Sequence, residues 1–200
     1  MKKYEFTGET KRVELWNRTA TLHRIKATVE FGFVKVGELG GWIEKEENLS
    51  HEGKAWVCGD AKVWGNAKVC GDAEVCGDAE VWGNAKVCGD AKVWGNAKVC
   101  GDAKVCGDAE VCGDAKVCGD AEVFLASHVL VMGSVGSRND FTTFFRDKDN
   151  EITVKCGCFL GKIDKFLEKV TQTHGNNKYA LVYRAAVEVA KLQIELTERK

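Results

Sequence analysis

A six-residue repeat fills the middle of the chain and limits its fold more than any other feature. From His51 to Met132 the sequence follows the pattern V-[C/W]-G-[D/N]-A-[K/E], with valine at position 57, at every sixth position to 123, and again at 129. A fixed short period is typical of stacked units that share one continuous core. The sequence therefore predicts a solenoid over this region.

The positions within one repeat predict strands and corners. Ala61 and Val63 lie two positions apart, so in an extended strand they point to one side while Lys62 points to the other. The Gly-Asp or Gly-Asn pair that follows favours a corner, because these residues tolerate left-handed backbone. Strand and corner alternating at this period predict a triangular coil.

This pattern resembles the hexapeptide-repeat left-handed parallel β-helix, in which an aliphatic residue is followed four positions later by a small one, as Val63 is by Ala67. The resemblance implies three repeats, or 18 residues, in each coil and roughly four coils stacked about 4.8 Å apart. The expected fold class is mainly β: a left-handed parallel β-helix with an N-terminal β cap and a C-terminal β-hairpin plus two α-helices.

An 18-residue coil places the side chains before each corner glycine in three columns. The columns read Trp64, Trp82, Cys100, Cys118; Cys58, Cys76, Trp94, Cys112; and Cys70, Cys88, Cys106, Phe124. Tryptophan always precedes Gly-Asn and cysteine always precedes Gly-Asp in this repeat, which duplication of a short DNA unit explains. A soft-metal site on the thiolates would lack histidine or carboxylate ligands at suitable spacing, so no metal is expected.

Composition excludes several classes of partner. The 29 Lys and Arg residues nearly balance the 30 Asp and Glu residues, and this leaves no basic field to attract DNA or a membrane surface. No stretch approaches the ~18 apolar residues of a membrane span, and the first residues do not read as a signal peptide. A cytoplasmic location is expected, with the ten cysteines as free thiols.

The sequence divides into three regions. Residues 1–40 alternate polar and apolar around Tyr4 to Phe6, Val13 to Trp16 and Leu22 to Phe33, which favours short antiparallel strands in an N-terminal β cap. Residues 41–132 are expected to form the β-helix, with a two-residue slip between Leu49 and Val57. Caps are expected at both ends because a β-helix exposes unpaired strands there.

Residues 133–200 are expected to form the C-terminal region that assembles subunits and binds a ligand. The runs DFTTFFR and EITVKCGC, joined by residues 147–150, predict a hairpin. Apolar residues at helical spacing from Ile163 to Val170 predict a helix that ends at His174-Gly175. A last helix, from about Lys178 to Arg199, can be capped by Asn176 or Asn177.

The last helix carries two apolar stripes. The first contains Tyr179, Tyr183, Ala186, Ala190 and Ile194, and the second contains Val182, Ala185, Val189, Leu192 and Leu196. One stripe suffices for packing within a subunit. The second has coiled-coil spacing and indicates a homo-oligomer, a dimer or a trimer, formed through this helix. The alternative is that one monomer buries both stripes.

The two ends of the chain resemble a family of small hexapeptide-repeat, or polymer-forming, proteins of bacterial viruses and prophages. The resemblance rests on KYEFTGET, RTATLHRIKA and VGELGGWIEKEENLS near the start, and on GSVGSRNDFTTFFRDKDNEITVKCGCFLG and THGNNKY near the end. It implies a viral or prophage origin and a non-housekeeping role, so the expected cytoplasm is that of a bacterial host cell, and it supplies no catalytic residues.

The stretch from Gly133 to Asn139 has the pattern of an anion site. Glycines can direct backbone N–H groups into one concavity, serines add donors, and Arg138 offers a fork suited to phosphate or carboxylate. The candidate ligand-binding residues are Ser134, Gly136, Ser137, Arg138, Asn139, Thr142, Thr143, Arg146, Lys155, Lys178 and Tyr179. The alternative is a tight capping turn in which Arg138 pairs with Asp140.

Enzymatic readings find less support. An acyltransferase of this fold needs a general base and a loop excursion, whereas the coils run uninterrupted and the four histidines lie scattered. Cys156, Cys158 and His174 fall short of a zinc set, and buried small thiols are expected there. No catalytic residue and no cofactor are predicted.

The sequence therefore favours a non-enzymatic, homo-oligomeric phage-type binding protein. It would capture a small nucleotide-like or phosphorylated anion near the end of the β-helix, and could sequester a host immune nucleotide signal. The alternative is a structural or protein-interaction scaffold that uses the Trp and Cys columns and binds no small ligand. The third reading is the acyltransferase.

Overall fold

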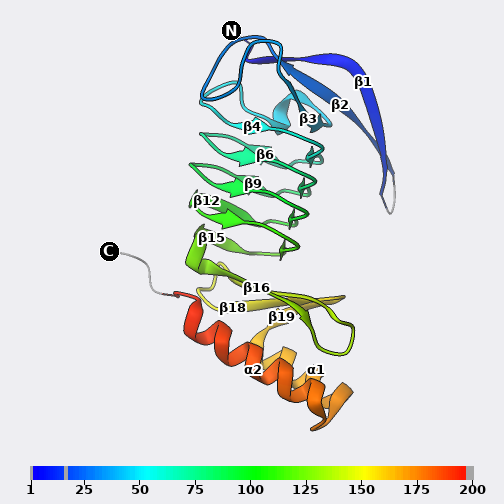
Figure 1. The fold of residues 1–200 in the computed structure, drawn as a ribbon, viewed down its shortest axis with the longest axis vertical. Coiled ribbons are helices and arrows are strands. Elements are labelled where there is room, and N and C mark those ends of the chain that lie inside the picture. Colours follow the sequence, from blue (N-terminus) through cyan, green and yellow to red (C-terminus); the bar gives the residue numbers. More distant parts are fainter. Residues whose placement is uncertain (1, 16–17, 197–200) are drawn as a thin grey trace.

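A parallel β-helix forms the body of the molecule, and each of its ends is covered by a different structure (Figure 1). The computed structural model describes residues 2–15 and 18–196. An N-terminal β-hairpin lies at one end, and an antiparallel sheet with two helices lies at the other. This is the predicted mainly β architecture.

Three stacks of short parallel strands form the sides of the β-helix. The first stack contains β3 (Leu39–Ile43), β5 (Lys62–Val63), β8 (Glu80–Val81), β11 (Lys98–Val99) and β14 (Lys116–Val117). The second contains β4 (Trp56–Val57), β7 (Glu74–Val75), β10 (Lys92–Val93) and β13 (Glu110–Val111). The third contains β6 (Lys68–Val69), β9 (Lys86–Val87), β12 (Lys104–Asp108) and β15 (Glu122–Leu125). Five stacked strands in the first stack correspond to about five coils.

The repeat pattern explains the core and the coil length. The valines from Val57 to Val123 and the alanines from Ala55 to Ala121 are all at most 1% exposed. Val63 pairs with Val81, so each coil takes 18 residues, as predicted. Each corner glycine has positive φ; at Gly89, for example, φ is 69°.

The two-residue slip is confirmed, and it lies within a coil that precedes the regular repeat. Ile43 pairs with Val63 and Leu49 with Val69, a separation of 20 positions, whereas Val57 pairs with Val75 at the regular 18. The additional two residues lie between Leu49 and Val57. The β-helix therefore begins one coil before the regular repeat.

The N-terminal cap is the predicted antiparallel structure. Strands β1 (Tyr4–Glu14) and β2 (Thr19–Ala27) pair with each other, and β2 continues the sheet through β3. The amino group of Lys3 donates to the carbonyl oxygens of Ala55 (2.8 Å) and Gly53 (3.3 Å), which satisfies acceptors at the open end of the first coil. The short helix η1 (Glu46–Asn48) completes that coil. Trp16, placed in a strand from the sequence, lies outside the described residues.

The N-terminal hairpin also covers part of the tryptophan column. The rings of Trp64 and Trp82 stack with centroids 5.1 Å apart and an interplanar angle of 2°. Ala20 and Leu22 of β2 pack in one cluster with Trp64, which is 5% exposed. Trp94, in another column, stays 49% exposed.

The cysteine columns form disulfide bonds within the β-helix. Cys58 is bonded to Cys76, Cys88 to Cys106, and Cys100 to Cys118. The expectation that all ten thiols are free is therefore wrong for these six residues, because stacking brings their Cα atoms to within 4.5 to 4.7 Å. Cys70, Cys112, Cys156 and Cys158 are free.

The β-helix ends earlier than the valine pattern suggests. After β15 the Gly-Asp corner is replaced by the short helix η2 (Ala126–His128), and Val129 begins β16 (Val129–Val135). β16 pairs antiparallel with β17 (Asp140–Arg146), which pairs with β18 (Ile152–Cys156), and β18 pairs with β19 (Phe159–Lys162). The predicted hairpin is the central pair of this four-stranded sheet.

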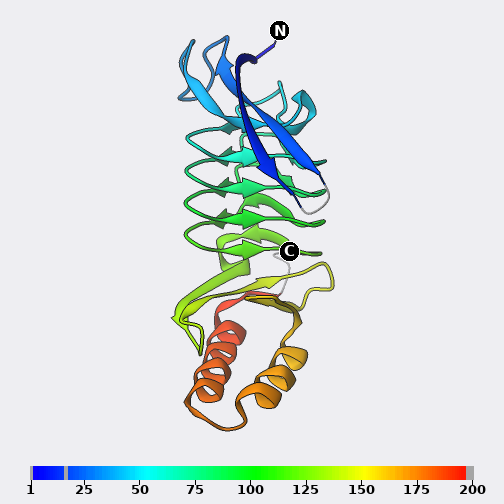
Figure 2. The same ribbon diagram turned by 90° about the vertical axis from the view of Figure 1, so that its right-hand side faces the viewer.

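The C-terminal sheet lies between the β-helix and the two helices (Figure 2). Phe145 joins the core of the β-helix, and its neighbour Phe144 points to the other side, into the core with the helices. The helices are α1 (Ile163–His174) and α2 (Lys178–Gln193). The side chain of Asn177 caps α2, as one of the two predicted candidates. This helix ends at Gln193, before the predicted Arg199, which lies outside the described residues.

Within the described residues, no helix is both long enough and apolar enough to cross a membrane.

Candidate functional site

A cavity of about 390 Å³ opens in the C-terminal region, between two turns of the sheet and the two helices. Its size lies within the range of small-molecule sites. It is lined by Ser137, Arg138, Cys156, Cys158, Phe159, Phe166, Lys169, Val170, Thr173, His174 and Tyr183.

Two glycines hold the turns of the sheet close to this cavity. Gly136 has φ of 75°, and a β-carbon there would lie 2.0 Å from the hydroxyl of Tyr183. Gly157 has φ of 55°, and a β-carbon there would lie 2.7 Å from a terminal nitrogen of Arg138. The turn between β16 and β17 therefore packs on α2, and the Arg138 guanidinium lies against the turn between β18 and β19.

The lining combines positive charge with an apolar floor. Arg138 and Lys169 face the cavity beside the ring of His174, and among the described residues none that lines it is a carboxylate. Phe166 and Val170 are buried beneath it, with Phe159 beside them. Burial and the neighbouring Cys156 raise the pKa of Tyr183, so its hydroxyl stays protonated. These features suit an anion that carries an apolar or aromatic group.

The structure brings some of the sequence-predicted residues to the cavity. Ser137 and Arg138 line it, with the Ser137 hydroxyl oxygen 3.5 Å from Nε2 of His174. The ring centroid of Tyr179 lies 5.8 Å from that of His174, and the Lys178 amino group lies over the Tyr179 ring. Gly136 shapes the turn, as described above. Ser134 and Asn139 are exposed on the neighbouring strand and turn.

Nine of the eleven predicted residues are not among those that line the cavity, and four of these nine, on β17 and β18, have partners elsewhere. The Thr142 hydroxyl donates to Sγ of Cys156, and Oγ1 of Thr143 accepts from the backbone N–H of Lys116 in the last coil. Arg146 is buried, donates to the Asn150 side chain (2.7 Å) and lies over the ring of Phe124. The Lys155 amino group donates to the carbonyl oxygen of Gly157. Sequence proximity suggested these residues, whereas alternation along β17 turns Thr143 toward the β-helix.

Sequence reasoning missed the wall supplied by α1. Phe166 and Val170 belong to the apolar stripe that predicted this helix, whereas Lys169 and Thr173, which also line the cavity, are polar and lie outside that stripe. Its position opposite Arg138 depends on long-range packing. Cys158 was expected to be buried and is exposed. The carboxylate of Asp140, a proposed partner of Arg138, accepts from the backbone N–H of Phe141.

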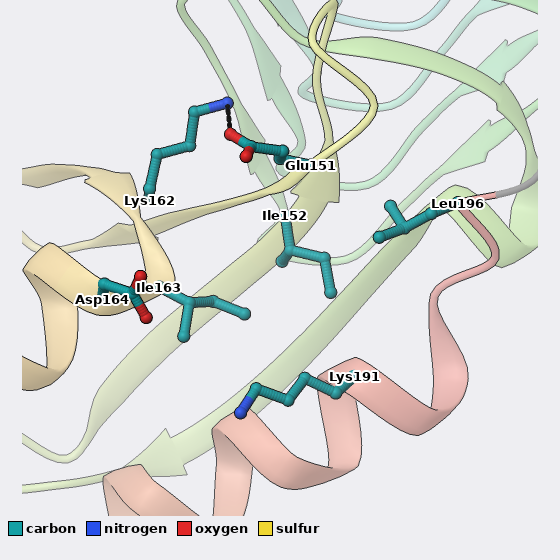
Figure 3. A pocket seen from close by; sticks show the side chains of 7 residues that line it. All are labelled: Glu151, Ile152, Lys162, Ile163, Asp164, Lys191 and Leu196. Carbon is teal, nitrogen blue, oxygen red and sulfur yellow. Dashed lines mark ion pairs between the residues drawn. The ribbon is translucent and has the colours of Figure 1, made fainter.

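A second, smaller cavity lies near the C-terminal end of α2 and is better explained by internal ion pairs (Figure 3). Lys162 there contacts the carboxylates of Asp147 (2.6 Å), Asp149 (3.3 Å) and Glu151 (2.6 Å). Burial opposes the charge on Lys162, but the hydrogen bonds that its ammonium group donates to these carboxylates raise its pKa overall. Since Glu151, Lys162 and Lys191 in this cavity already form ion pairs, the Arg138 cavity is the stronger candidate.

These observations define the class of protein: a parallel β-helix with a cationic cavity in its C-terminal cap. Comparison with models of known protein families gives no match, and no curated protein matches the sequence. In the described part of the chain, no three His, Cys, Asp or Glu side chains converge to hold a metal ion. The residues of the cavity therefore carry the functional argument.

Proposed function

We propose that this protein binds a small anionic ligand, nucleotide-like or phosphorylated, in the Arg138 cavity and does not transform it chemically. The observation that carries the proposal is the pairing of Arg138 and Lys169 with an aromatic floor, in a lining without carboxylates. The guanidinium would form two parallel hydrogen bonds to phosphate oxygens. Phe159 and Tyr183 would contact the apolar part of the ligand.

A binding protein without turnover acts by lowering the free concentration of its ligand. In a phage-infected cell, this cavity would sequester a nucleotide signal of the host. The ratio of binding sites to signal molecules would then determine how far the free concentration of the signal falls. Assembly into an oligomer would multiply the number of binding sites per particle.

Substitution of Arg138 by glutamine is expected to weaken binding of nucleoside monophosphates and cyclic nucleotides by about tenfold or more, because a charge-assisted bidentate contact is lost. Native mass spectrometry across a nucleotide panel measures the bound mass and the number of sites. The Arg12→Gln variant, which changes an exposed arginine on the distant hairpin, is the control and should bind as the wild type does. Equal binding by wild type and Arg138→Gln would refute the proposal.

The same assay distinguishes the scaffold alternative from the nucleotide-binding proposal. It depends on exposed residues of the Trp and Cys columns, and Trp94 is the most exposed tryptophan among the described residues. Trp94→Ala should leave nucleotide binding unchanged. A wild-type protein that binds nothing from the panel would shift support to the scaffold.

We also propose that α2 pairs with α2 of a second copy of the chain. Its first stripe is buried or half-buried within the subunit, but Val182, Val189 and Leu192 of the second stripe are 41%, 45% and 90% exposed. An antiparallel pairing would set Lys178, at the start of one helix, beside Glu195, just after the end of the other. Both side chains are exposed, and their charges are complementary.

Aspartate at Val189 is expected to convert the dimer into a monomer, because each copy would bury a charge in the apolar contact. Light scattering after size-exclusion chromatography measures the mass. Val36→Asp changes a valine that is 65% exposed in the N-terminal region and is the matched control. Lys178→Glu should weaken the dimer, and adding Glu195→Lys should restore it. A wild-type monomer, or a double variant that stays weakened, would contradict the antiparallel pairing.

A further inference from the structure

Two cysteines in the C-terminal region have no explanation in the repeat. Eight of the ten cysteines occupy the repeated position before a corner glycine, where duplication accounts for them. Cys156 and Cys158 lie outside the repeat, and both line the Arg138 cavity. Both are free, with Cys158 exposed and Cys156 partly buried. Their shared position in the cavity requires a separate explanation.

The hairpin between β18 and β19 holds the two thiols near positive charge. Cys156 is the last residue of β18 and pairs with Phe159, so Gly157 and Cys158 form the turn. The Arg138 guanidinium lies against Gly157, the residue between the two cysteines. Reactive cysteines occur in electropositive, partly exposed surroundings of this kind.

Polar neighbours contact the inner thiol. The Thr142 hydroxyl donates a hydrogen bond to Sγ of Cys156 at 3.3 Å, and the Tyr183 hydroxyl lies 4.0 Å from the same sulfur. Cys158 is the more exposed of the two, so a ligand in the cavity meets its thiol before that of Cys156.

We infer that this cavity, which would leave a bound nucleotide unchanged, also exchanges thiols with small anionic disulfides, an inference that rests on the proposed anion-binding function. The thiolate of Cys158 attacks one sulfur of the bound disulfide, a mixed disulfide forms, and the first thiolate leaves. The thiolate of Cys156 then attacks Sγ of Cys158 and releases the second thiolate. The protein is oxidised to a Cys156–Cys158 disulfide, and the disulfide ligand is reduced to two thiols that take up the two protons.

The sequence allows these two cysteines to be observed apart from the repeat. Trypsin cleaves after Lys155 and Lys162, which isolates both thiols in the peptide CGCFLGK. Folded protein would be exposed to glutathione disulfide, quenched at intervals with N-ethylmaleimide, digested without reductant and analysed by mass spectrometry. The expected product is the peptide that has lost two hydrogens. In the Cys156→Ser variant the reaction should stop at the glutathione adduct of Cys158.

The Arg138→Gln variant tests recognition of the anion. It should slow exchange with glutathione disulfide by about tenfold, and it should change exchange with neutral hydroxyethyl disulfide by less than about twofold. A wild-type peptide that keeps both thiols after treatment with each of the two disulfides would overturn the inference. A Cys156→Ser variant that still yields the peptide lacking two hydrogens would overturn it as well.

Nucleotide binding separates failure of this inference from failure of the proposed function. A wild-type protein that binds nucleotides but does not exchange with glutathione disulfide would leave anion binding supported and overturn only the thiol chemistry. Exchange that proceeds equally with both reagents and in Arg138→Gln would overturn anion recognition in both proposals.

Discussion

Replacing Cys58 and Cys76 together by serine is expected to lower the free energy of unfolding by about 3 kcal/mol, because each disulfide closes a short loop and restricts the unfolded chain. The two residues are 18 positions apart, in adjacent coils of one column. Urea unfolding without reductant measures the change. The same difference should disappear when wild type and variant are both unfolded in a reductant that cleaves the bond.

The free cysteines of the same columns provide the control for this prediction. Cys112 is separated from Cys76 by Trp94, and Cys70 is unpaired although it precedes Cys88. Serine at Cys70 and Cys112 together should change the free energy of unfolding by less than about 1 kcal/mol. A loss as large as that of the Cys58 and Cys76 pair would show that thiol packing, not cross-linking, stabilises the coils.

Alanine at Gly89 is expected to lower the free energy of unfolding by about 2 to 4 kcal/mol, which adds the cost of a left-handed backbone to that of a steric clash. The backbone has φ of 69° there, and a β-carbon would lie 2.8 Å from the backbone nitrogen of Gly107 in the next coil. Neither the strand nor the corner can move without disturbing its neighbour. Thermal and urea unfolding of the purified variant measure the loss.

Gly113 is a matched control for this substitution, because it separates the two causes. Its φ is 63°, but a β-carbon there would meet no atom within 4 Å. Gly113→Ala should therefore cost only about 1 kcal/mol, the penalty for the backbone conformation alone. Equal losses at the two positions would mean that the contact between coils adds nothing.

The repeat made the β-helix predictable, because the same local rule applies in every coil. The small and aliphatic side chains of Ala61 and Val63 predict that both point into the core, and the glycine that follows predicts the corner. The end of the β-helix was placed too late because Val129 preserves the spacing of the valines, although the corner before it has lost its glycine. Spacing alone could not show that this valine starts an antiparallel strand.

The candidate site was predictable only in part. The Gly-rich turn pointed to Ser137 and Arg138, and both line the cavity. Lys169 and Tyr183 come from two helices that are far from this turn in sequence, and tertiary packing determines which of their faces meets it. The disulfides were missed for another reason. The expected reducing compartment predicted free thiols, whereas an 18-residue coil places cysteines of one column close enough to form disulfide bonds.

The regular coil also determines how this protein can change in length. Because one coil contains three repeats, gain or loss of 18 residues would lengthen or shorten the shaft and leave the angle between its two caps unchanged. Gain of a single hexad would instead turn the C-terminal cavity by about a third of a revolution relative to the N-terminal hairpin. Insertion of whole coils would therefore adjust the distance between the two caps, and insertion of single hexads their relative direction, without altering a residue in either cap.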